Sequence, residues 1–388
     1  MTGSAVALTG ALRAALREEL DSARALRRRL HAHPRVSGDE ADTTDLVVDA
    51  LGAGPGLPAA ETGRVVLLGG GRAAEGCIAL RAELDALPVT EATGVAWAAT
   101  GGAMHACGHD VHLAATVAAC RAIDRVGAPL PVAALLQPRE ETAPSGAREI
   151  VASGLLDAIG ARAVVGAHVQ PHIDARRIAV TPGLVNASVD EFEITVHGGG
   201  GHAGYPHTVR DPVVALASIV LNLQQIPARR IDPVHGAVCL VGGLSAGTAP
   251  NVVPSSARAI GSLRLMRAED RQQAARELVE IVEASAAAYG CRADVRLVDG
   301  EPALRNDPTL AHRAAAALHA EGYDVVTDFR SFGADDFAHY SERLPALMMF
   351  VGVDGGAGLH DPRFLPPDDA VDTVAEVLLA GYVAALAG

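Results

Sequence analysis

The sequence predicts an α/β protein with two domains, in which a mostly parallel sheet is interrupted by an inserted α+β domain. The chain has 388 residues, which is long for a single hydrophobic core, and 49% of them are apolar. Strand-like and helix-like segments alternate up to residue 180 and again after residue 292, and this alternation is typical of parallel sheets. Between them the order changes to β-α-β-β-α. We therefore expect one domain from residues 1–180 and 292–388, and a second from residues 181–291.

Composition narrows the partners and the compartment. The net charge is −14, all 32 basic residues are arginine, and the five cysteines are widely scattered. An acidic chain is a poor match for nucleic acid or an anionic membrane, and a chain without lysine cannot form a Schiff base or a lysine-containing phosphate loop. An odd number of scattered cysteines argues against a framework of disulfide bonds. The sequence shows no signal peptide and no apolar run long enough to span a membrane. We expect a cytoplasmic protein that binds neither nucleic acid nor membranes.

The elements of the larger domain follow from apolar periodicity and turn residues. An amphipathic pattern predicts the first helix, and short apolar runs bounded by glycine or proline predict strands. A Gly-Gly-Gly turn at residues 69–71 separates the first two strands. The predicted strands cover residues 64–68, 77–84, 131–136, 163–166 and 346–351, and the predicted helices residues 12–30, 113–120, 145–152, 308–321 and 369–387.

The inserted domain is expected to contain three strands and two helices. A four-glycine loop, residues 198–201, precedes His202, and it lacks the lysine and the spacing of a phosphate-binding loop. We therefore expect its glycines to permit a tight turn that presents His202. The predicted strands are residues 189–196, 237–241 and 257–265, and the predicted helices are residues 212–225 and 269–288.

Residues 104–112 indicate a metal site. This stretch contains three histidines, a cysteine and an aspartate, and it leads into an apolar helix. Cys107 and His109 supply thiolate and imidazole, the ligands that zinc and neighbouring metals prefer. By itself, the pair also fits a buried thiol beside an imidazole that caps the helix.

Further ligand-type side chains follow other predicted strands. Asp85, the pair Glu140 and Glu141, His168 and His360 each come at or after the end of a strand. The carboxyl ends of parallel strands meet at one edge of a sheet, so these groups are expected to converge there. Adjacent residues of an extended segment point in opposite directions, which allows one glutamate to bind metal and the other to act as a base.

Each of these residues also has an ordinary structural interpretation. Asp85 fits a turn ahead of Pro88, and the two glutamates fit the solvated start of the helix at residues 145–152. His360 is a single histidine in a loop, and it is a candidate ligand only because it follows a predicted strand.

Eight motifs spread along the chain resemble the M20 metallopeptidase/amidohydrolase family, in its subgroup of N-acyl amino acid and indole-acetyl amino acid amidohydrolases. They occur in the order found in that family. They are residues 81–88 (RAELDALP), 105–110 (HACGHD), 137–141 (QPREE), 166–168 (GAH), 200–206 (GGHAGYP), 251–254 (NVVP), 333–337 (GADDF) and 359–360 (LH).

The resemblance implies one or two divalent metal ions (zinc, manganese, cobalt or nickel) and names their ligands. It implies Glu140 as general base and Asp85 as the carboxylate that orients a histidine or polarises the site. It implies a catalytic metal-binding domain and a lid and dimerisation domain. The implied metal ligands are Cys107, His109, Glu141, His168 and His360.

The resemblance also assigns roles to the inserted domain. His202 of a neighbouring subunit is implied to stabilise the tetrahedral oxyanion, which makes a homodimer, possibly a tetramer, the expected assembly. Asn251 and Arg264 are implied to hold the carboxylate or acyl group of the substrate. The implied function is a metal-dependent amidohydrolase of the aminoacylase or hippurate-hydrolase kind, with a small-molecule N-acyl amino acid as substrate. An M20-type dipeptidase and an N-acetyl-diaminopimelate deacetylase are the alternatives.

Several residues depart from the family pattern. Glu83 stands where aspartate is usual, Arg139 replaces an alanine before Glu140, and Arg35 replaces a glutamate. Residues 142–145 replace a stretch richer in glycine. Because no implied ligand is lost, a catalytically silent binding protein is not favoured.

Overall fold

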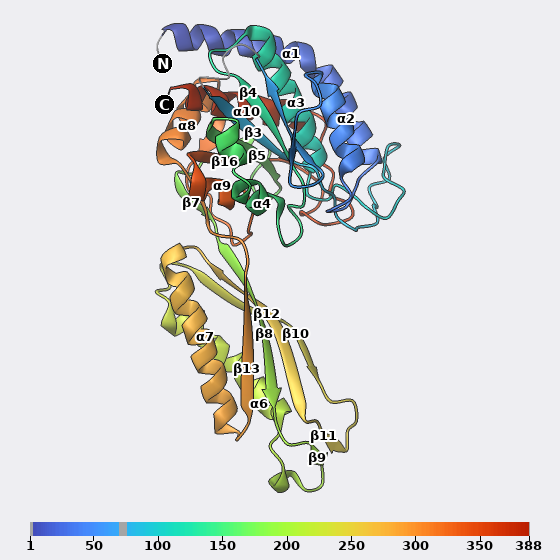
Figure 1. The fold of residues 1–388 in the computed structure, drawn as a ribbon, viewed down its shortest axis with the longest axis vertical. Coiled ribbons are helices and arrows are strands. Elements are labelled where there is room, and N and C mark those ends of the chain that lie inside the picture. Colours follow the sequence, from blue (N-terminus) through green and yellow to red (C-terminus); the bar gives the residue numbers. More distant parts are fainter. Residues whose placement is uncertain (1–2, 70–75, 388) are drawn as a thin grey trace. The chain divides into compact units, whose positions relative to one another are not determined.

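A computed structural model describes residues 3–69 and 76–387 (Figure 1). The glycine turn predicted at residues 69–71 lies largely outside the described residues. The internal contacts divide the chain into two compact units. The first unit lies within Met1–Gly183, Arg305–Phe329 and Asp336–Gly388, and the second consists of Leu184–Leu304 and Arg330–Asp335.

The first unit is built on a mostly parallel sheet, as predicted. Its described strands form one eight-stranded sheet in the order β1-β2-β4-β3-β5-β16-β6-β15, and the neighbours among the middle four strands are all parallel. Every residue of β4 (Val132–Gln137) and β16 (Ala346–Gly352) is buried, as expected for strands covered on both faces. The remaining strands are β1 (Leu57–Ala59), β2 (Gly63–Leu68), β3 (Cys77–Glu83), β5 (Ala161–Gln170), β6 (Arg177–Ala179) and β15 (Asp324–Val326).

Two long helices pack directly against this sheet. Helix α3 (His109–Val126) contacts β3 and β4, α10 (Ala370–Leu386) contacts β5 and β16, and α1 (Gly3–Ala32) contacts both helices (Figure 1). Their apolar faces form one core with the sheet. The other helices are α2 (Ala41–Leu51), α4 (Gly146–Ala152), α5 (Leu155–Ala158), α8 (Pro308–Ala320) and α9 (Ala338–Arg343).

Helix α3 begins four residues before the predicted start. Gly108 caps it with a left-handed φ of 84°, and a Cβ on this glycine would come within 2.4 Å of the Val169 side chain. His109 and His112 are therefore helical residues. The prediction started the helix too late because polar residues usually mark a loop, whereas these polar side chains are buried at the helix start.

The second unit contains a four-stranded antiparallel sheet in the order β10-β12-β8-β13, with α6 (Pro212–Leu223) and α7 (Ala268–Ala288) packed on it (Figure 1). In β8 (Ser188–His197) buried residues alternate with more exposed ones, as expected for a sheet covered on one face. The other two strands of the sheet are β10 (Ala237–Ala246) and β12 (Ser256–Leu265).

Strand β13 (Arg292–Asp299) extends the second unit beyond residue 291, the end predicted from the sequence. Residues 292–299 pair with β8, and the unit continues to Leu304. The alternating side chains of β13 gave little apolar signal because most of them are exposed. Short pairs complete the strands: β7 (Gly183–Asn186) with β14 (Leu304–Asn306), and β9 (Gly201–His202) with β11 (Val252–Val253).

The structure bears on two expectations from composition, one about the cysteines and one about membrane-spanning helices. All five cysteines are free and buried. Within residues 3–69 and 76–387, no helix combines the length and the apolar composition needed to cross a membrane.

Candidate metal centre

The structure brings the five predicted ligands together at the carboxyl edge of the first unit's sheet. One ligand atom each of Cys107, His109 and Glu141 lies within 4.8 Å of the others. Cys107 Sγ is 3.5 Å from His168 Nε2, and Glu141 Oε1 is 3.3 Å from His360 Nε2. The convergence follows from the parallel strands, because β4, β5 and β16 all end at this edge.

His168 lies inside a strand rather than after one. Strand β5 continues to Gln170, four residues beyond the predicted end, and His168 pairs with Phe350 of β16. The prediction ended the strand early because the polar side chains of His168 and Gln170 interrupt the apolar run, although both are buried.

The two buried imidazoles are oriented to accept a cation. His109 Nδ1 donates to the carbonyl oxygen of Asp85 at 2.8 Å, and His168 Nδ1 donates to the carbonyl oxygen of Val169 at 2.6 Å. With Nδ1 protonated, each Nε2 carries a lone pair. His109 Nε2 is buried without a hydrogen-bond partner among the described residues. A metal ion bound at Nε2 would satisfy this atom, and the second nitrogen's hydrogen bond is the usual support for a metal-binding histidine.

Acidic groups make the same place favourable for positive charge. Burial opposes the charged form of His109, but Glu83, Asp85 and Glu141 outweigh it and raise its pKa. Burial, together with Glu141, Glu140 and Glu83, raises the pKa of the Cys107 thiol well above its ordinary value. A divalent cation stabilises a thiolate, so its binding would lower the pKa of Cys107 again. The residues present therefore fit a divalent metal.

His168 is held in the neutral form that metal binding requires. Burial is the main cause, and the neighbouring His112 adds to it; together they lower the pKa of His168 to about 3. His360 is different, since its side chain is 52% exposed and its hydrogen bond with Glu141 raises its pKa.

Glu140 and Asp85 flank the candidate ligands. Glu140 Oε2 lies 3.9 Å from His109 Nε2, and its side chain is 12% exposed. The carboxylate of Asp85 is fully buried and 3.7 Å from His109 Nδ1, so the residue orients His109 through its backbone carbonyl. Asp85 Oδ2 instead accepts hydrogen bonds from the Ser37 hydroxyl at 2.7 Å and from the Glu141 N–H at 3.0 Å.

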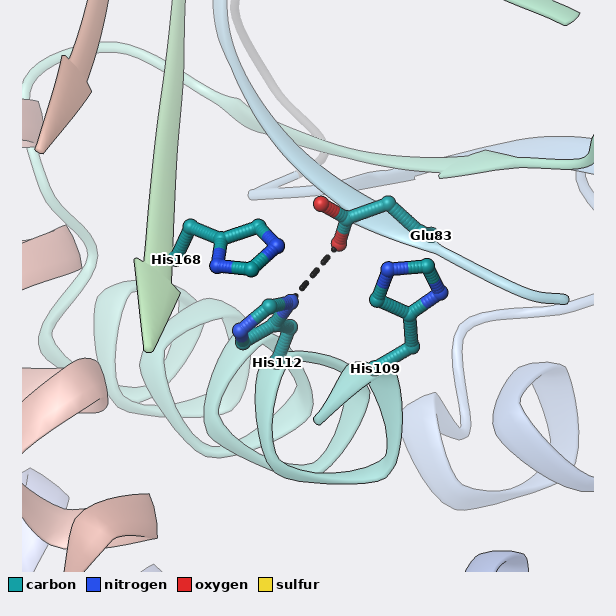
Figure 2. A group of neighbouring side chains, drawn as sticks. All are labelled: Glu83, His109, His112 and His168. Carbon is teal, nitrogen blue, oxygen red and sulfur yellow. Dashed lines mark hydrogen bonds and ion pairs between the residues drawn. The ribbon is translucent and has the colours of Figure 1, made fainter. Parts of the chain in front are cut away.

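A second group of possible ligands, Glu83, His109, His112 and His168, lies beside the first (Figure 2). The protein itself already satisfies two of its members. His112 Nδ1 donates to Glu83 Oε2 at 3.0 Å, and His112 Nε2 accepts the Val169 N–H at 2.9 Å. Glu83 Oε1 also pairs with the buried Arg81. We therefore interpret Glu83 and His112 as support for the ligands rather than as ligands.

The sequence patterns predict no role for His112 or Glu83. His112 lies three residues after His109 and so falls on the same face of α3, which is the signal that was available. Glu83 departs from the family pattern, and the alternation of side chains along a strand places residues 81, 83 and 85 on one side of β3 and its continuation.

The remaining predicted residues belong to the second unit. His202 lies on β9, and its Nδ1 accepts the Gly204 N–H at 2.9 Å. The carbonyl of Asn251 accepts the Ala203 N–H at 3.1 Å, which fixes Asn251 beside His202. Arg264 lies on β12 and donates to the carbonyl of Phe332 at 2.7 Å. Within this unit His202 and Asn251 therefore lie together, whereas Arg264 pairs with Val189 near the other end of β12.

The donor set and the adjacent carboxylate are those of a metal-dependent hydrolase. The sequence model of peptidase family M20/M25/M40 matches residues 79–381. The chain belongs to this family, which confirms the resemblance seen in the motifs.

Two relatives and one solved structure each cover between 78% and 95% of this chain. An N-acetylcysteine deacetylase of Bacillus subtilis is 34% identical over 362 residues, 90% of this chain and 93% of the relative. An N-acetyldiaminopimelate deacetylase of Shouchella clausii is 35% identical over 308 residues, 78% of this chain and 81% of the relative. A dinuclear metal binding peptidase of the M20 family from Bacillus subtilis has a TM-score of 0.82 at 31% identity, covering 95% and 99% of the two chains. The present chain is accordingly a metal-dependent hydrolase of amide bonds.

Proposed function

We propose that this protein is an amidohydrolase that removes the acyl group from N-acyl amino acids, with Glu140 as general base. The observation that carries the proposal is the group formed by Cys107, His109 and Glu141, in which His109 Nε2 is buried without a partner among the described residues and lies 3.9 Å from Glu140. Two relatives that cover most of the chain are deacetylases of N-acetylated amino acids, which supports this substrate class.

Cys107, His109, Glu141, His168 and His360 would hold one or two divalent ions, with zinc, manganese, cobalt and nickel as candidates. When bound, such ions lower the pKa of water and polarise an amide carbonyl. Glu140 takes the proton of the attacking water and returns it to the leaving amine. Burial of the surrounding side chains excludes bulk water and so strengthens these electrostatic interactions.

The second unit is proposed to act as a lid and dimerisation domain and the first as the catalytic domain. In a homodimer, or a tetramer, His202 of one subunit would stabilise the oxyanion formed in the other, and Asn251 and Arg264 would hold the substrate's carboxylate or acyl group. The acidic composition and the five free cysteines support the proposal of a cytoplasmic enzyme without nucleic-acid or membrane partners.

An N-acetyl-diaminopimelate deacetylase is a specific form of this proposal, supported by the Shouchella clausii relative. The other alternative is a dipeptidase of the M20 type. Hydrolysis of N-acetyl amino acids, N-benzoyl glycine, N-acetyl-diaminopimelate and a dipeptide with a free amine distinguishes these activities. We expect cleavage of the acylated substrates, sensitive to chelator and restored by added divalent metal. Cleavage of the dipeptide alone would contradict the proposal.

A further inference from the structure

Glu140 stands on a short segment whose backbone must be held in place if its carboxylate is to act as a base. The segment leaves β4 and leads to α4. Arg139, immediately before Glu140, has a left-handed φ of 53°, which a residue with a side chain adopts at an energetic cost. Such a backbone conformation persists only when its surroundings impose it. The contacts of the peptides on both sides of Glu140 show what these surroundings are.

Two buried carboxylates bind the N–H groups on either side of Glu140. Glu40 Oε1 accepts the Arg139 N–H at 3.0 Å, and Asp85 Oδ2 accepts the Glu141 N–H at 3.0 Å. Both carboxylates are completely buried. The two bonds therefore fix the backbone at residues 139 and 141 and leave the side chain of residue 140 between them.

The same carboxylates attach this segment to the loop that follows α1. Glu40 Oε1 also accepts the Gly38 N–H at 2.8 Å, and Asp85 Oδ2 also accepts the Ser37 hydroxyl at 2.7 Å. Each carboxylate thus joins residues 37–38 to residues 139–141. The two carboxylates therefore link the two loops to each other.

Glu40 is placed as a helix cap but does not act as one through its side chain. It is the N-cap residue of α2, yet its carboxylate makes no hydrogen bond to the N–H groups of that helix. Its second oxygen, Oε2, accepts the Thr62 hydroxyl at 2.7 Å. A buried carboxylate is unfavourable unless it is fully hydrogen-bonded, and the side-chain bonds of Glu40 all go outside α2. The backbone carbonyl of Glu40 accepts the Thr44 N–H of α2 at 2.9 Å, whereas its carboxylate is bonded to the Glu140 segment and to residues 38 and 62.

The segment is closely packed as well as hydrogen-bonded. A Cβ on Gly146 would lie 1.9 Å from the Pro138 carbonyl oxygen, and a Cβ on Gly63 would lie 2.7 Å from Pro138 Cδ. The Gly146 N–H also donates to the Arg139 carbonyl at 3.1 Å. Small displacements of residues 138–141 are therefore resisted on several sides.

We propose that Glu40 is a positioning residue for Glu140, acting through the N–H of Arg139 and in concert with Asp85. This proposal rests on the proposed function for its kinetic consequence, because it treats Glu140 as the general base. It adds a residue that lies 100 positions earlier in the chain and does not touch the candidate metal ligands in any described hydrogen bond.

The test compares variants of the two oxygens of Glu40 in the full-length, metal-loaded protein. Glu40→Ala removes both acceptors, whereas Glu40→Gln retains an oxygen that can accept the two N–H groups. Thr62→Val is the matched control, because it removes a donor to the other oxygen of the same carboxylate without touching the Glu140 segment. Glu40→Asp, which is shorter by one methylene, serves if Glu40→Ala does not fold.

We expect Glu40→Ala or Glu40→Asp to lower kcat by roughly 10- to 100-fold, the range typical of residues that support a catalytic site, with KM and bound metal little changed. Glu40→Gln should recover most of this loss. Thr62→Val should lower thermal stability without a comparable loss of kcat. A loss of kcat that follows thermal stability equally in all four variants would mean a merely structural role and would overturn the proposal.

Amide hydrogen exchange provides a readout that does not depend on activity. Peptides that contain residues 138–141 should exchange faster in Glu40→Ala or Glu40→Asp than in the wild type and Thr62→Val. Peptides from β5 should be unchanged in every variant. If the wild type hydrolyses none of the amides, the proposed function fails, and exchange still decides whether Glu40 holds this segment. Unchanged exchange at residues 138–141 in the Glu40 variants would overturn the positioning role.

Discussion

Replacing His112 by phenylalanine separates a supporting residue from a metal ligand. The substitution keeps an aromatic ring of similar size beside His168, whose ring centroid is 4.6 Å from that of His112. It removes both hydrogen bonds of His112, the 3.0 Å bond to Glu83 and the 2.9 Å bond from Val169 N–H. The Val169 N–H is left without its acceptor, and Glu83 keeps Arg81 as its partner.

The magnitude follows from these two bonds. A buried N–H without an acceptor costs about 1–3 kcal/mol, and a hydrogen bond to a charged group contributes about 1.5–3 kcal/mol. Together they predict that His112→Phe lowers the free energy of unfolding by roughly 2.5–6 kcal/mol, measured by urea denaturation of the metal-free protein. Loss of support for a metal ligand typically weakens metal binding by about 10- to 100-fold.

Metal affinity, measured by competition with a chelating dye, distinguishes the two roles. We expect His112→Phe to weaken binding less than His109→Ala, which removes a candidate ligand. His312→Phe, at an exposed position of α8, is the matched control and should leave both stability and affinity near the wild-type values. If His112→Phe weakened metal binding as much as His109→Ala, His112 would be a ligand, and its assignment as a supporting residue (Figure 2) would be wrong.

Three further predictions concern other parts of the same unit. Glu140→Gln should lower kcat by at least ~10²–10⁴ with metal still bound, and near-full turnover would exclude Glu140 as the base. Arg27→Met leaves the carboxylate of Asp110 buried without its arginine partner, which predicts a loss of about 3–5 kcal/mol in unfolding free energy at neutral pH. Burial opposes the charged form of Asp110, but Arg27 and His31 outweigh it and hold its pKa well below the ordinary value. The stabilisation that they provide is fully present above the unfolded-state pKa of about 3.9. The difference in unfolding free energy between wild type and Arg27→Met should therefore narrow as the pH falls below that value. Gly146→Ala places a Cβ 1.9 Å from the Pro138 carbonyl oxygen. It should lower the free energy of unfolding, measured by urea denaturation, by about 1–3 kcal/mol and should also lower kcat. Unchanged stability and kcat would mean that residues 138–146 shift freely to make room for the methyl group.

The parallel sheet and the convergence of the candidate ligands could be predicted because both follow from local patterns. Apolar runs such as that of β4 identify buried strands, and parallel strands bring their carboxyl ends to one edge. Cys107, His109, Glu141, His168 and His360 could be predicted as a group for this reason, together with the family motifs. Their approach in the structure depends on the strand order, which the sequence pattern alone does not specify.

The supporting residues could not be predicted because their roles depend on tertiary contacts. Glu40 reads as an ordinary residue before a helix, and only the fold places it beside Arg139, 99 positions later in the chain. His112 belongs to a histidine-rich stretch, but its hydrogen bonds to Glu83 and Val169 distinguish it from the candidate ligands. Strand β13 was missed because an exposed edge strand has few apolar residues.

The central claim is that the carboxyl edge of the first unit's sheet binds divalent metal and uses Glu140 to hydrolyse an amide bond. The most direct test is the metal content of purified wild type, His109→Ala and Glu140→Gln after reconstitution and desalting, with hydrolysis of N-acyl amino acids measured on the same samples. The account predicts metal in wild type and Glu140→Gln, little metal in His109→Ala, and hydrolysis by the wild type alone. Equal metal content in wild type and His109→Ala, or hydrolysis by metal-free protein, would contradict it.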